Sequence, residues 1–282
     1  MRIDEALRGA VERLRGVSDS PRLDAELLLA RAIDVAGSYL LAHPEDVLDD
    51  DAVERFRLAI DRRAAGVPVP YITGVREFWS IALAVSPDTL VPRPETELLV
   101  ELALGHLPPG RALRVLDLGT GSGAIAVALA KERPSSFITA TDQSAAALAV
   151  ARENARRHLL ANIEFTLGDW TSAVAGARFD LIVSNPPYLA VDDPALPSLR
   201  HEPLTALVAG NDGLDTFRIL ARDCRALLDV GGSLLLEHGV DQREQVAGIL
   251  VAAGWSQIEC FRDLAGRPRV TQATWLAGDA TA

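Results

Sequence analysis

A buried-strand pattern that runs into a glycine-rich turn and then into an apolar helix constrains the fold of this 282-residue chain most strongly. Residues 113–118 are mostly apolar, residues 119–123 read Gly-Thr-Gly-Ser-Gly, and residues 124–130 carry a helical pattern. Glycines admit positive φ and let a ligand approach the backbone, while the N-terminus of a helix offers free N–H groups. The sequence therefore predicts a strand, a turn and a helix that bind a ligand at the turn.

Strand patterns alternate with helical patterns over the rest of the C-terminal part, which predicts an α/β fold with a doubly wound sheet. Only a short turn, residues 263–268, separates the last two strands, so we expect them to pair as a hairpin and the final strand to run antiparallel. Seven strands are expected, at residues 113–118, 137–142, 163–167, 179–184, 233–237, 258–262 and 270–276.

The N-terminal region predicts a small helical domain, because apolar residues recur at helical spacing up to about residue 66. Residues 67–70, Val-Pro-Val-Pro, break that pattern, and residues 77–84 and 89–91 predict two short strands of a linker hairpin. A further helix is expected to open at Arg93 and to run to about Leu104. The predicted domains are a helical domain (1–66), a linker with a β-hairpin (67–92) and a sheet domain (93–282).

Two carboxylates bear on which ligand the glycine turn binds. The glycines also satisfy the relaxed dinucleotide fingerprint, so a nicotinamide or flavin site has to be considered. Asp117 precedes the first glycine and would repel a pyrophosphate, whereas it would tolerate the sulfonium and ammonium groups of S-adenosylmethionine. Asp142 ends the next strand, where a ribose-binding carboxylate is expected. The alternative role of Asp142 is a helix cap, for which Ser144 is equally well placed.

The third strand runs into Gly168-Asp169-Trp170, an acid beside an indole. Asp169 could accept a hydrogen bond from the exocyclic amine of an adenine, and Trp170 could cover its face. Trp170 as a core residue is the competing interpretation.

The fourth strand is followed by Asn185-Pro186-Pro187-Tyr188. Proline fixes φ and removes a donor, so this loop presents carbonyl groups in a stiff frame. The Asn185 side-chain oxygen and the Pro186 carbonyl could accept the two N–H groups of a methyl-accepting amine or amide, and Tyr188 could supply a flat face. A proline-stiffened turn that closes a strand is the alternative.

These motifs, in this order, resemble a class I S-adenosylmethionine-dependent methyltransferase of the amino-methylating branch. Further segments are similar to the release factor glutamine methyltransferase family (PrmC, also called HemK), and the resemblance covers nearly the whole chain. They lie at residues 71–74, 77–79, 90–97, 202–203, 206–207, 210, 212–214, 263–267 and 269–270. At His238 the family pattern is loose, and we expect that position to be structural.

The resemblance implies a Rossmann-like methyltransferase sheet and a helical domain, 1–66, that contacts the protein substrate. It implies methyl transfer to the side-chain amide nitrogen of the glutamine in the Gly-Gly-Gln motif of class I peptide chain release factors, with S-adenosylhomocysteine as product. Catalysis falls to Asn185, Pro186 and Tyr188, and substrate binding to residues 185–188. Cofactor binding is expected at Gly119, Thr120, Gly121, Ser122, Gly123, Asp142, Asp169, Trp170 and Asn185.

Three other functions remain open from the sequence. A related enzyme could methylate a ribosomal protein glutamine, a second class methylates exocyclic amines of DNA or RNA, and a Rossmann-like binding module would transfer no methyl group. The net charge of −11 and the lack of a basic stripe argue against nucleic acid, because phosphate contacts need clustered basic side chains.

Composition adds the remaining expectations. Cys224 and Cys260 lack a pairing motif and metal-ligand spacing, which suits a reducing compartment and predicts no metal site. No apolar run is long enough to cross a membrane, and the N-terminus has acids where a signal peptide has none. We therefore expect a cytoplasmic monomer without a membrane contact.

Overall fold

The computed structural model describes residues 1–276 of the chain, which form two compact units. The first unit runs from Met1 to Val75, and the second begins at Arg76.

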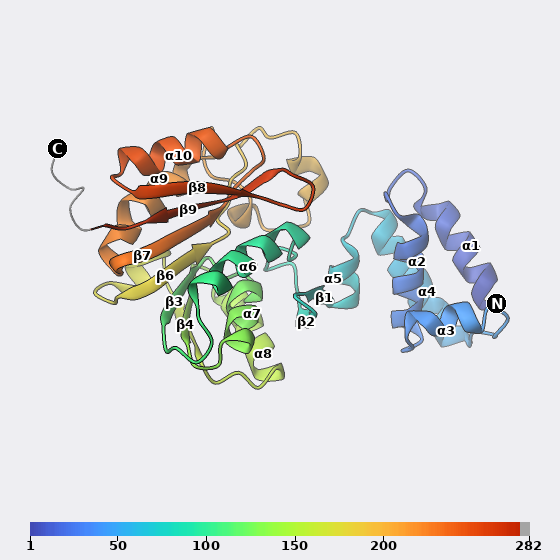
Figure 1. The fold of residues 1–282 in the computed structure, drawn as a ribbon. Helices are drawn as coiled ribbons and strands as arrows, with labels where there is room; N and C mark the ends of the chain where they lie inside the picture. Colours follow the sequence, from blue (N-terminus) through green and yellow to red (C-terminus); the bar gives the residue numbers. More distant parts are fainter. Residues whose placement is uncertain (277–282) are drawn as a thin grey trace. The chain divides into compact units, whose positions relative to one another are not determined.

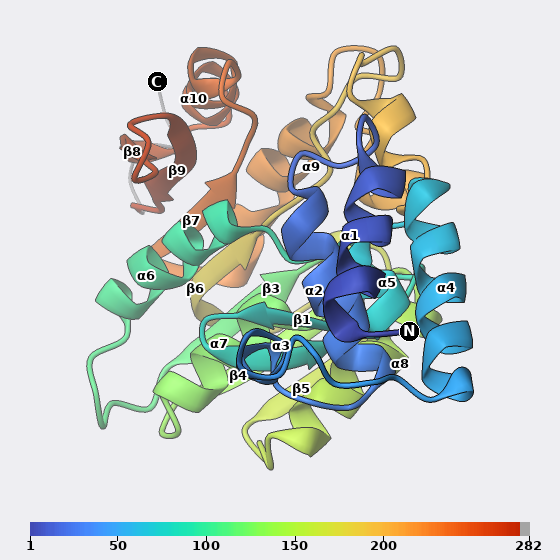
Figure 2. The ribbon, with the colours of Figure 1, turned by 90° about the vertical axis from the view of Figure 1, so that its right-hand side faces the viewer.

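The first unit is helical, as predicted, and Figure 2 shows α1, α2 and α4 as its long helices. Helix α2 begins with Pro21 at its first turn, and the Asp49 side chain caps α4 by accepting from the Ala52 N–H at 2.6 Å. Helices α1, α2 and α4 pack on one another around Leu14, Leu29 and other buried apolar side chains. Its helices are α1 (Ile3–Leu14), α2 (Pro21–Ala32), α3 (Gly37–Ala42), α4 (Asp50–Ala64) and α5 (Val69–Thr73).

The first unit continues past residue 66, where the sequence pattern places the domain boundary. The Val-Pro-Val-Pro break is followed by the short helix α5, in which Pro70 occupies a first-turn position that needs no N–H donor. Helix α5 contacts α2 and α4 and buries Tyr71. Gly74 ends it in the left-handed conformation, so the chain leaves the helical unit there.

The linker hairpin is real, but its predicted strands are wrong. Strands β1 (Val75–Phe78) and β2 (Ile81–Ala84) pair with each other, and residues 89–91 form no strand. The turn consists of Trp79 and Ser80, which have φ values of 53° and 54°. Tight β-hairpins favour a turn with two left-handed residues, and asparagine or glycine usually occupies these positions. The pair Trp-Ser gives no such signal, so the sequence pattern predicts one continuous strand over residues 77–84.

The second unit contains the predicted seven-stranded sheet, in the order β5-β4-β3-β6-β7-β9-β8. Strand β9 runs antiparallel to both β7 and β8, which confirms the prediction for the end of the chain. The other pairings are parallel. The strands are β3 (Arg114–Leu118), β4 (Phe137–Asp142), β5 (Ile163–Leu167), β6 (Phe179–Ser184), β7 (Leu228–Glu237), β8 (Ser256–Arg262) and β9 (Pro268–Thr274).

Helices cover both faces of this sheet (Figure 1). One face packs against α6 (Glu97–His106), α7 (Ala124–Glu132) and α8 (Ala145–Arg157), with Phe78, Ile81 and Leu83 of the hairpin in the same apolar core. The other face packs against α9 (Asp215–Asp223) and α10 (Arg243–Ala252). The doubly wound α/β fold is therefore confirmed.

Short 3₁₀ helices connect several of these elements: η1 (Pro94–Thr96), η2 (Trp170–Val174), η3 (Leu196–Leu199), η4 (Leu204–Ala206) and η5 (Cys224–Leu227). The helix expected from Arg93 thus opens as η1 and continues as α6 to His106. No helix within residues 1–276 is long and apolar enough to cross a membrane.

Candidate active site

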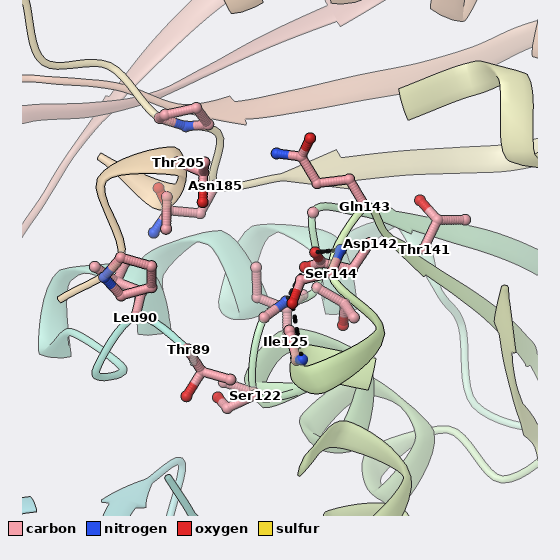
Figure 3. Close-up of a pocket in the computed structure, with 18 of the residues that line it drawn as sticks. Thr89, Leu90, Ser122, Ile125, Thr141, Asp142, Gln143, Ser144, Asn185 and Thr205 are labelled. Atoms are coloured by element: carbon pink, nitrogen blue, oxygen red, sulfur yellow. Dashed lines mark hydrogen bonds between the residues drawn. The ribbon is translucent and has the colours of Figure 1, made fainter. Parts of the chain in front are cut away.

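A pocket opens where the carboxyl ends of β3, β4, β5 and β6 meet, which is where open α/β sheets bind ligands. It offers about 940 Å³ of empty space, open to solvent in part. In Figure 3, Asp142 and Ser144 lie on one side of the view, and Asn185, Thr205 and Leu90 lie on the other. The pocket brings together nine of the predicted site residues: Gly119, Thr120, Gly121, Ser122, Asp142, Asp169, Trp170, Asn185 and Pro187.

The glycine turn lies against the neighbouring strand. The backbone N–H groups of Gly119 and Thr120 both donate to the Thr141 carbonyl at 2.9 Å. Gly123 is the N-cap of α7, and it is not among the described residues that line the pocket. A Cβ atom on Gly123 would lie 3.1 Å from Ala151 Cβ, so this glycine lets α7 approach α8. A cofactor contact of Gly123 stays a prediction.

Asp142 organises this turn through both carboxylate oxygens, as the dashed lines in Figure 3 mark. Its Oδ2 accepts from the Gly121 N–H at 2.9 Å, and its Oδ1 accepts from the Ser144 N–H at 2.8 Å. The cap of α8 is Ser144, whose hydroxyl accepts from the Ala147 N–H at 3.2 Å. Asp142 is therefore not the helix cap, and it borders the pocket where a ribose-binding carboxylate is needed.

Asp117 lies beneath the glycine turn and not in the pocket. Its side chain is fully buried, and the Thr120 hydroxyl donates to its Oδ2 at 2.6 Å. Burial raises the pKa of Asp117 to about 7, an effect that the Thr120 hydrogen bond reduces and the charge of Asp142 increases. Asp117 is therefore not among the described residues that line the pocket, and its predicted effect on the choice of ligand stays a prediction.

Asp169 and Trp170 line the pocket at the end of β5. The Trp170 ring lies against the glycine turn, since a Cβ atom on Gly119 would be 3.4 Å from it. The indole is half-buried and also packs on the apolar core beneath α9. The interpretation of Trp170 as a core residue therefore holds in part, while its contact with an adenine stays a prediction.

Asn185 and Pro187 border the pocket beyond β6, whereas Pro186 and Tyr188 do not line it within residues 1–276. The Asn185 Nδ2 group donates to the Thr96 hydroxyl at 3.1 Å. The Tyr188 backbone is fixed on both sides: its N–H donates to Leu207, and its carbonyl accepts from Gln242 at 2.9 Å. Burial raises the pKa of the Tyr188 phenol to about 12, so the ring is neutral at physiological pH.

Thr96 and Glu237 lie at this site although neither was a predicted site residue; only the family resemblance of residues 90–97 pointed to the turn that holds Thr96. Thr96 lines the pocket from η1, and Glu237 is a buried carboxyl group at the end of β7. Burial raises the pKa of Glu237 to about 7, while hydrogen bonds from Thr96 and Asn185 oppose that rise. Both residues stand in segments that look ordinary, a first helical turn and a strand end. Only the tertiary fold brings them to Asn185.

One wall of the pocket consists of two segments far apart in sequence, residues 88–93 and 203–206. Glu202 joins them, because its Oε2 accepts from the Val91 N–H at 3.0 Å and its Oε1 accepts from Arg93 at 2.5 Å. Glu202 is buried, so this ion pair is sheltered from solvent on one side. Glu202 therefore connects the two segments that form this wall.

The lining fits S-adenosylmethionine better than a dinucleotide. Asp88, Asp142 and Asp169 border the pocket, while Arg93 is its one cationic side chain among the described residues and is already paired with Glu202. Carboxylates suit an ammonium group, a sulfonium and ribose hydroxyls, and they oppose a pyrophosphate. No group of three or more His, Cys, Asp or Glu side chains that could hold a metal ion occurs within residues 1–276.

The fold is that of a class I, Rossmann-like methyltransferase, and together with the family matches it shows an enzyme that uses S-adenosylmethionine as methyl donor. Family models agree: residues 5–74 match the PrmC N-terminal domain, and residues 95–196 match the methyltransferase small domain. The chain belongs to the release factor glutamine methyltransferase family.

Curated relatives with that family name match this chain over nearly their whole length. The enzyme of Xylella fastidiosa (strain Temecula1) is 49% identical over 267 residues, which cover 94% of this chain and 95% of that one. The enzyme of Coxiella burnetii is 45% identical over 271 residues, covering 96% and 98%.

Solved structures support the fold alone. A methyltransferase from Pyrococcus furiosus superposes with a TM-score of 0.54 at 18% identity, covering 70% of this chain and 89% of that one. The 16S rRNA N2 G1207 methyltransferase of T. thermophilus, in complex with AdoMet and guanosine, has a TM-score of 0.54 at 19% identity, covering 71% and 49%.

Proposed function

We propose that this chain transfers the methyl group of S-adenosylmethionine to the side-chain amide nitrogen (N5) of the glutamine in the Gly-Gly-Gln motif of class I peptide chain release factors. The observation that carries the proposal is Asn185, which borders the cofactor pocket with its amide nitrogen engaged by Thr96. Its oxygen is then left to accept a substrate N–H. The name shared by the curated relatives supports the choice of substrate.

The bound cofactor supplies an electrophilic methyl group on a sulfonium. An amide nitrogen is a poor nucleophile because its lone pair is delocalised, so the chain has to contribute position and charge stabilisation. The Asn185 side-chain oxygen and the Pro186 carbonyl accept the two N–H hydrogen bonds of the glutamine amide. They aim the nitrogen into the pocket and favour positive charge that develops on it. Tyr188 packs on the amide plane, and water removes the proton from the methylated amide.

The cofactor is held at the other side of the pocket in this proposal. Asp142 accepts hydrogen bonds from the ribose hydroxyls, and Asp169 and Trp170 hold the adenine. The glycine turn, residues 119–123, supports the rest of the cofactor. The helical N-terminal unit contacts the release factor in this proposal, and the match of residues 5–74 to the PrmC N-terminal domain supports a role particular to this family. Together these assignments give each unit of the chain a separate task.

Labelling with radioactive S-adenosylmethionine tests the proposal. The protein is incubated separately with a class I release factor, with the same factor carrying alanine in place of the Gly-Gly-Gln glutamine, with ribosomal proteins, and with DNA and RNA. Label on the first factor alone is expected. Label on the alanine factor, or on ribosomal protein or nucleic acid in its place, would reject the proposed substrate.

A further inference from the structure

Three polar side chains meet behind the substrate side of the pocket. Asn185 donates through Nδ2 to the Thr96 hydroxyl at 3.1 Å, and Thr96 is 4% exposed. Glu237 is 1% exposed and follows Leu236, the residue that pairs with Ser184 across β6 and β7, so it lies beside Asn185. Thr96 and Asn185 both favour its charged form. Its Oε2 atom has no hydrogen-bond partner within the described residues. A buried carboxylate is costly, so its place beside Asn185 calls for a physical reason.

The direction of these hydrogen bonds supplies that reason. An ionised carboxylate only accepts, so the Thr96 hydroxyl has to point its hydrogen at Glu237. The hydroxyl oxygen of Thr96 is then an acceptor for Asn185, and only the NH₂ end of the Asn185 amide can donate to it. The two ends of an amide have nearly the same shape, so a hydrogen-bond network has to select between them.

We propose that Thr96 and Glu237 are positioning residues that hold the Asn185 amide with its oxygen turned towards the substrate. This inference rests on the proposed function, in which that oxygen accepts an N–H of the glutamine amide. Neither residue touches the reacting atoms in this assignment. If the amide turned over, its NH₂ group would face the NH₂ group of the substrate, and two donors would oppose each other.

Protonation of Glu237 allows the hydrogen bonds of this network to run in the opposite direction. A neutral carboxyl group can donate to Thr96, whose hydroxyl can then donate to the oxygen of Asn185 and turn the amide over. The charged groups around Glu237 are Glu95, which disfavours its ionisation, and Arg269, which favours it. Tyr188 also faces Glu237 and stays neutral, with its pKa at about 12. The pKa of Glu237, at about 7, places the change near neutral pH, and turnover should fall as the pH falls below it.

Kinetics with Glu237→Gln and Thr96→Val test the inference. Glu237→Gln removes the charge that makes this group an acceptor only, and Thr96→Val removes the hydroxyl that links it to Asn185. In both variants kcat at pH 8 should fall about tenfold to a hundredfold, as expected for loss of a hydrogen bond to a charged group. The KM for the release factor and the calorimetric affinity for S-adenosylmethionine should change less than about threefold. The decline of kcat on the acidic side, present in the wild type, should be absent in Glu237→Gln.

Two further variants separate positioning from general damage. Thr96→Ser keeps the hydroxyl and should recover most of the turnover that Thr96→Val loses. Thr139→Val removes the hydroxyl of a similarly buried threonine, 7% exposed, in the middle of β4 and away from the pocket. It should keep the wild-type kcat. Equal losses of kcat in Thr96→Val and Thr139→Val, or an unchanged kcat and acidic limb in Glu237→Gln, would overturn the inference.

An NMR measurement without substrate separates this inference from the proposed function. The side-chain NH₂ signals of Asn185, identified by their loss in Asn185→Ser, should shift between pH 5.5 and 8.5 in the wild type and stay constant in Glu237→Gln. Signals that do not move in the wild type would refute the positioning role. If they move as expected while no release factor is methylated, the proposed substrate fails and the network stands.

Discussion

In each half of the pocket a threonine hydroxyl lies beside a buried carboxyl group. The residues involved are close in sequence in one half and far apart in the other. In the cofactor half, Thr120 donates to the buried Asp117 only three residues earlier. In the substrate half, Thr96 and Asn185 are 89 residues apart, and Glu237 comes from a third segment. A local motif therefore defines the first half, whereas the second exists only once the sheet has formed.

The two halves also carry the same electrostatic cost. Asp117 and Glu237 are both buried carboxyl groups whose pKa is raised to about 7, in each case mainly by burial. A group that titrates near 7 inside a protein stabilises the fold less when it is ionised. The chain keeps both groups where an aliphatic side chain would pack at lower cost. We infer that each half gives up stability for a defined orientation of polar atoms.

The largest effect is expected in the substrate half, from Asn185→Ala. This variant removes one proposed acceptor of the substrate amide, so kcat should fall at least about a hundredfold, as for other groups that stabilise developing charge. Affinity for S-adenosylmethionine, measured by calorimetry, should stay within about threefold. Equal losses of turnover and cofactor affinity would show that the two halves do not divide the work in this way.

Asp117→Asn tests the cost in the cofactor half. The folded-state pKa of Asp117 is raised above its ordinary value, so the wild type is more stable below about pH 4 and loses that stability as the pH rises through about 7. Asparagine keeps an acceptor for Thr120 but cannot ionise. Without cofactor, the free energy of unfolding of the variant relative to the wild type should increase by about 2 kcal/mol between pH 5 and pH 8.

Chemical denaturation at the two pH values makes that measurement, with Glu237→Gln in parallel. Both variants should gain stability at pH 8, because both remove a buried charge. An advantage that shrinks with rising pH would mean that the charge of Asp117 is stabilised by its surroundings, against the likeness drawn between the halves.

Local signals explain which parts of this molecule could be predicted from its sequence. The strands at 137–142, 163–167 and 179–184 match β4, β5 and β6, because short apolar runs bounded by turns report burial directly. The antiparallel β9 also follows from a local fact, the short turn before it. The pocket-lining glycines and Asp142 were found for the same reason: their spacing is fixed by one strand, one turn and one helix.

Features that depend on tertiary context could not be predicted. The Trp79-Ser80 turn adopts left-handed angles that its residue types do not favour, and the surrounding core over Phe78 and Ile81 holds it. Residue types alone make Thr96 part of an ordinary helix turn and Glu237 part of a strand end, and even the family resemblance of residues 90–97 does not tell that the two lie close together. The contact of Asp117 with Thr120 could not be predicted, because spacing alone does not tell whether a side chain near the end of a strand faces the pocket or is buried beneath the turn.

A smaller effect is expected in the cofactor half from Asp142→Asn. The amide keeps one oxygen, so one of the hydrogen bonds from the Gly121 and Ser144 N–H groups is lost, and a ribose contact weakens. The dissociation constant for S-adenosylmethionine should rise about tenfold, the cost of one hydrogen bond to a charged group. At saturating cofactor, kcat should stay within about threefold, the reverse of Asn185→Ala. In the double variant the two effects should add within about 0.5 kcal/mol, and strong coupling would argue that the halves act as one unit.

The smallest effect distinguishes two glycines within the cofactor half. Gly121 and Gly123 have φ values of 56° and 82°, so alanine at either position costs about 1 kcal/mol of backbone strain. A Cβ atom on Gly121, which lines the pocket, meets no atom within 4 Å, whereas one on Gly123 lies 3.1 Å from Ala151 Cβ. Gly121→Ala should therefore weaken cofactor affinity about fivefold with a modest loss of stability. Gly123→Ala should lower the free energy of unfolding further and leave affinity nearly unchanged, because its methyl group meets α8 and not the ligand. Calorimetry and denaturation of both variants decide the matter, and a larger affinity loss in Gly123→Ala would place that glycine among the direct cofactor contacts that the sequence predicts.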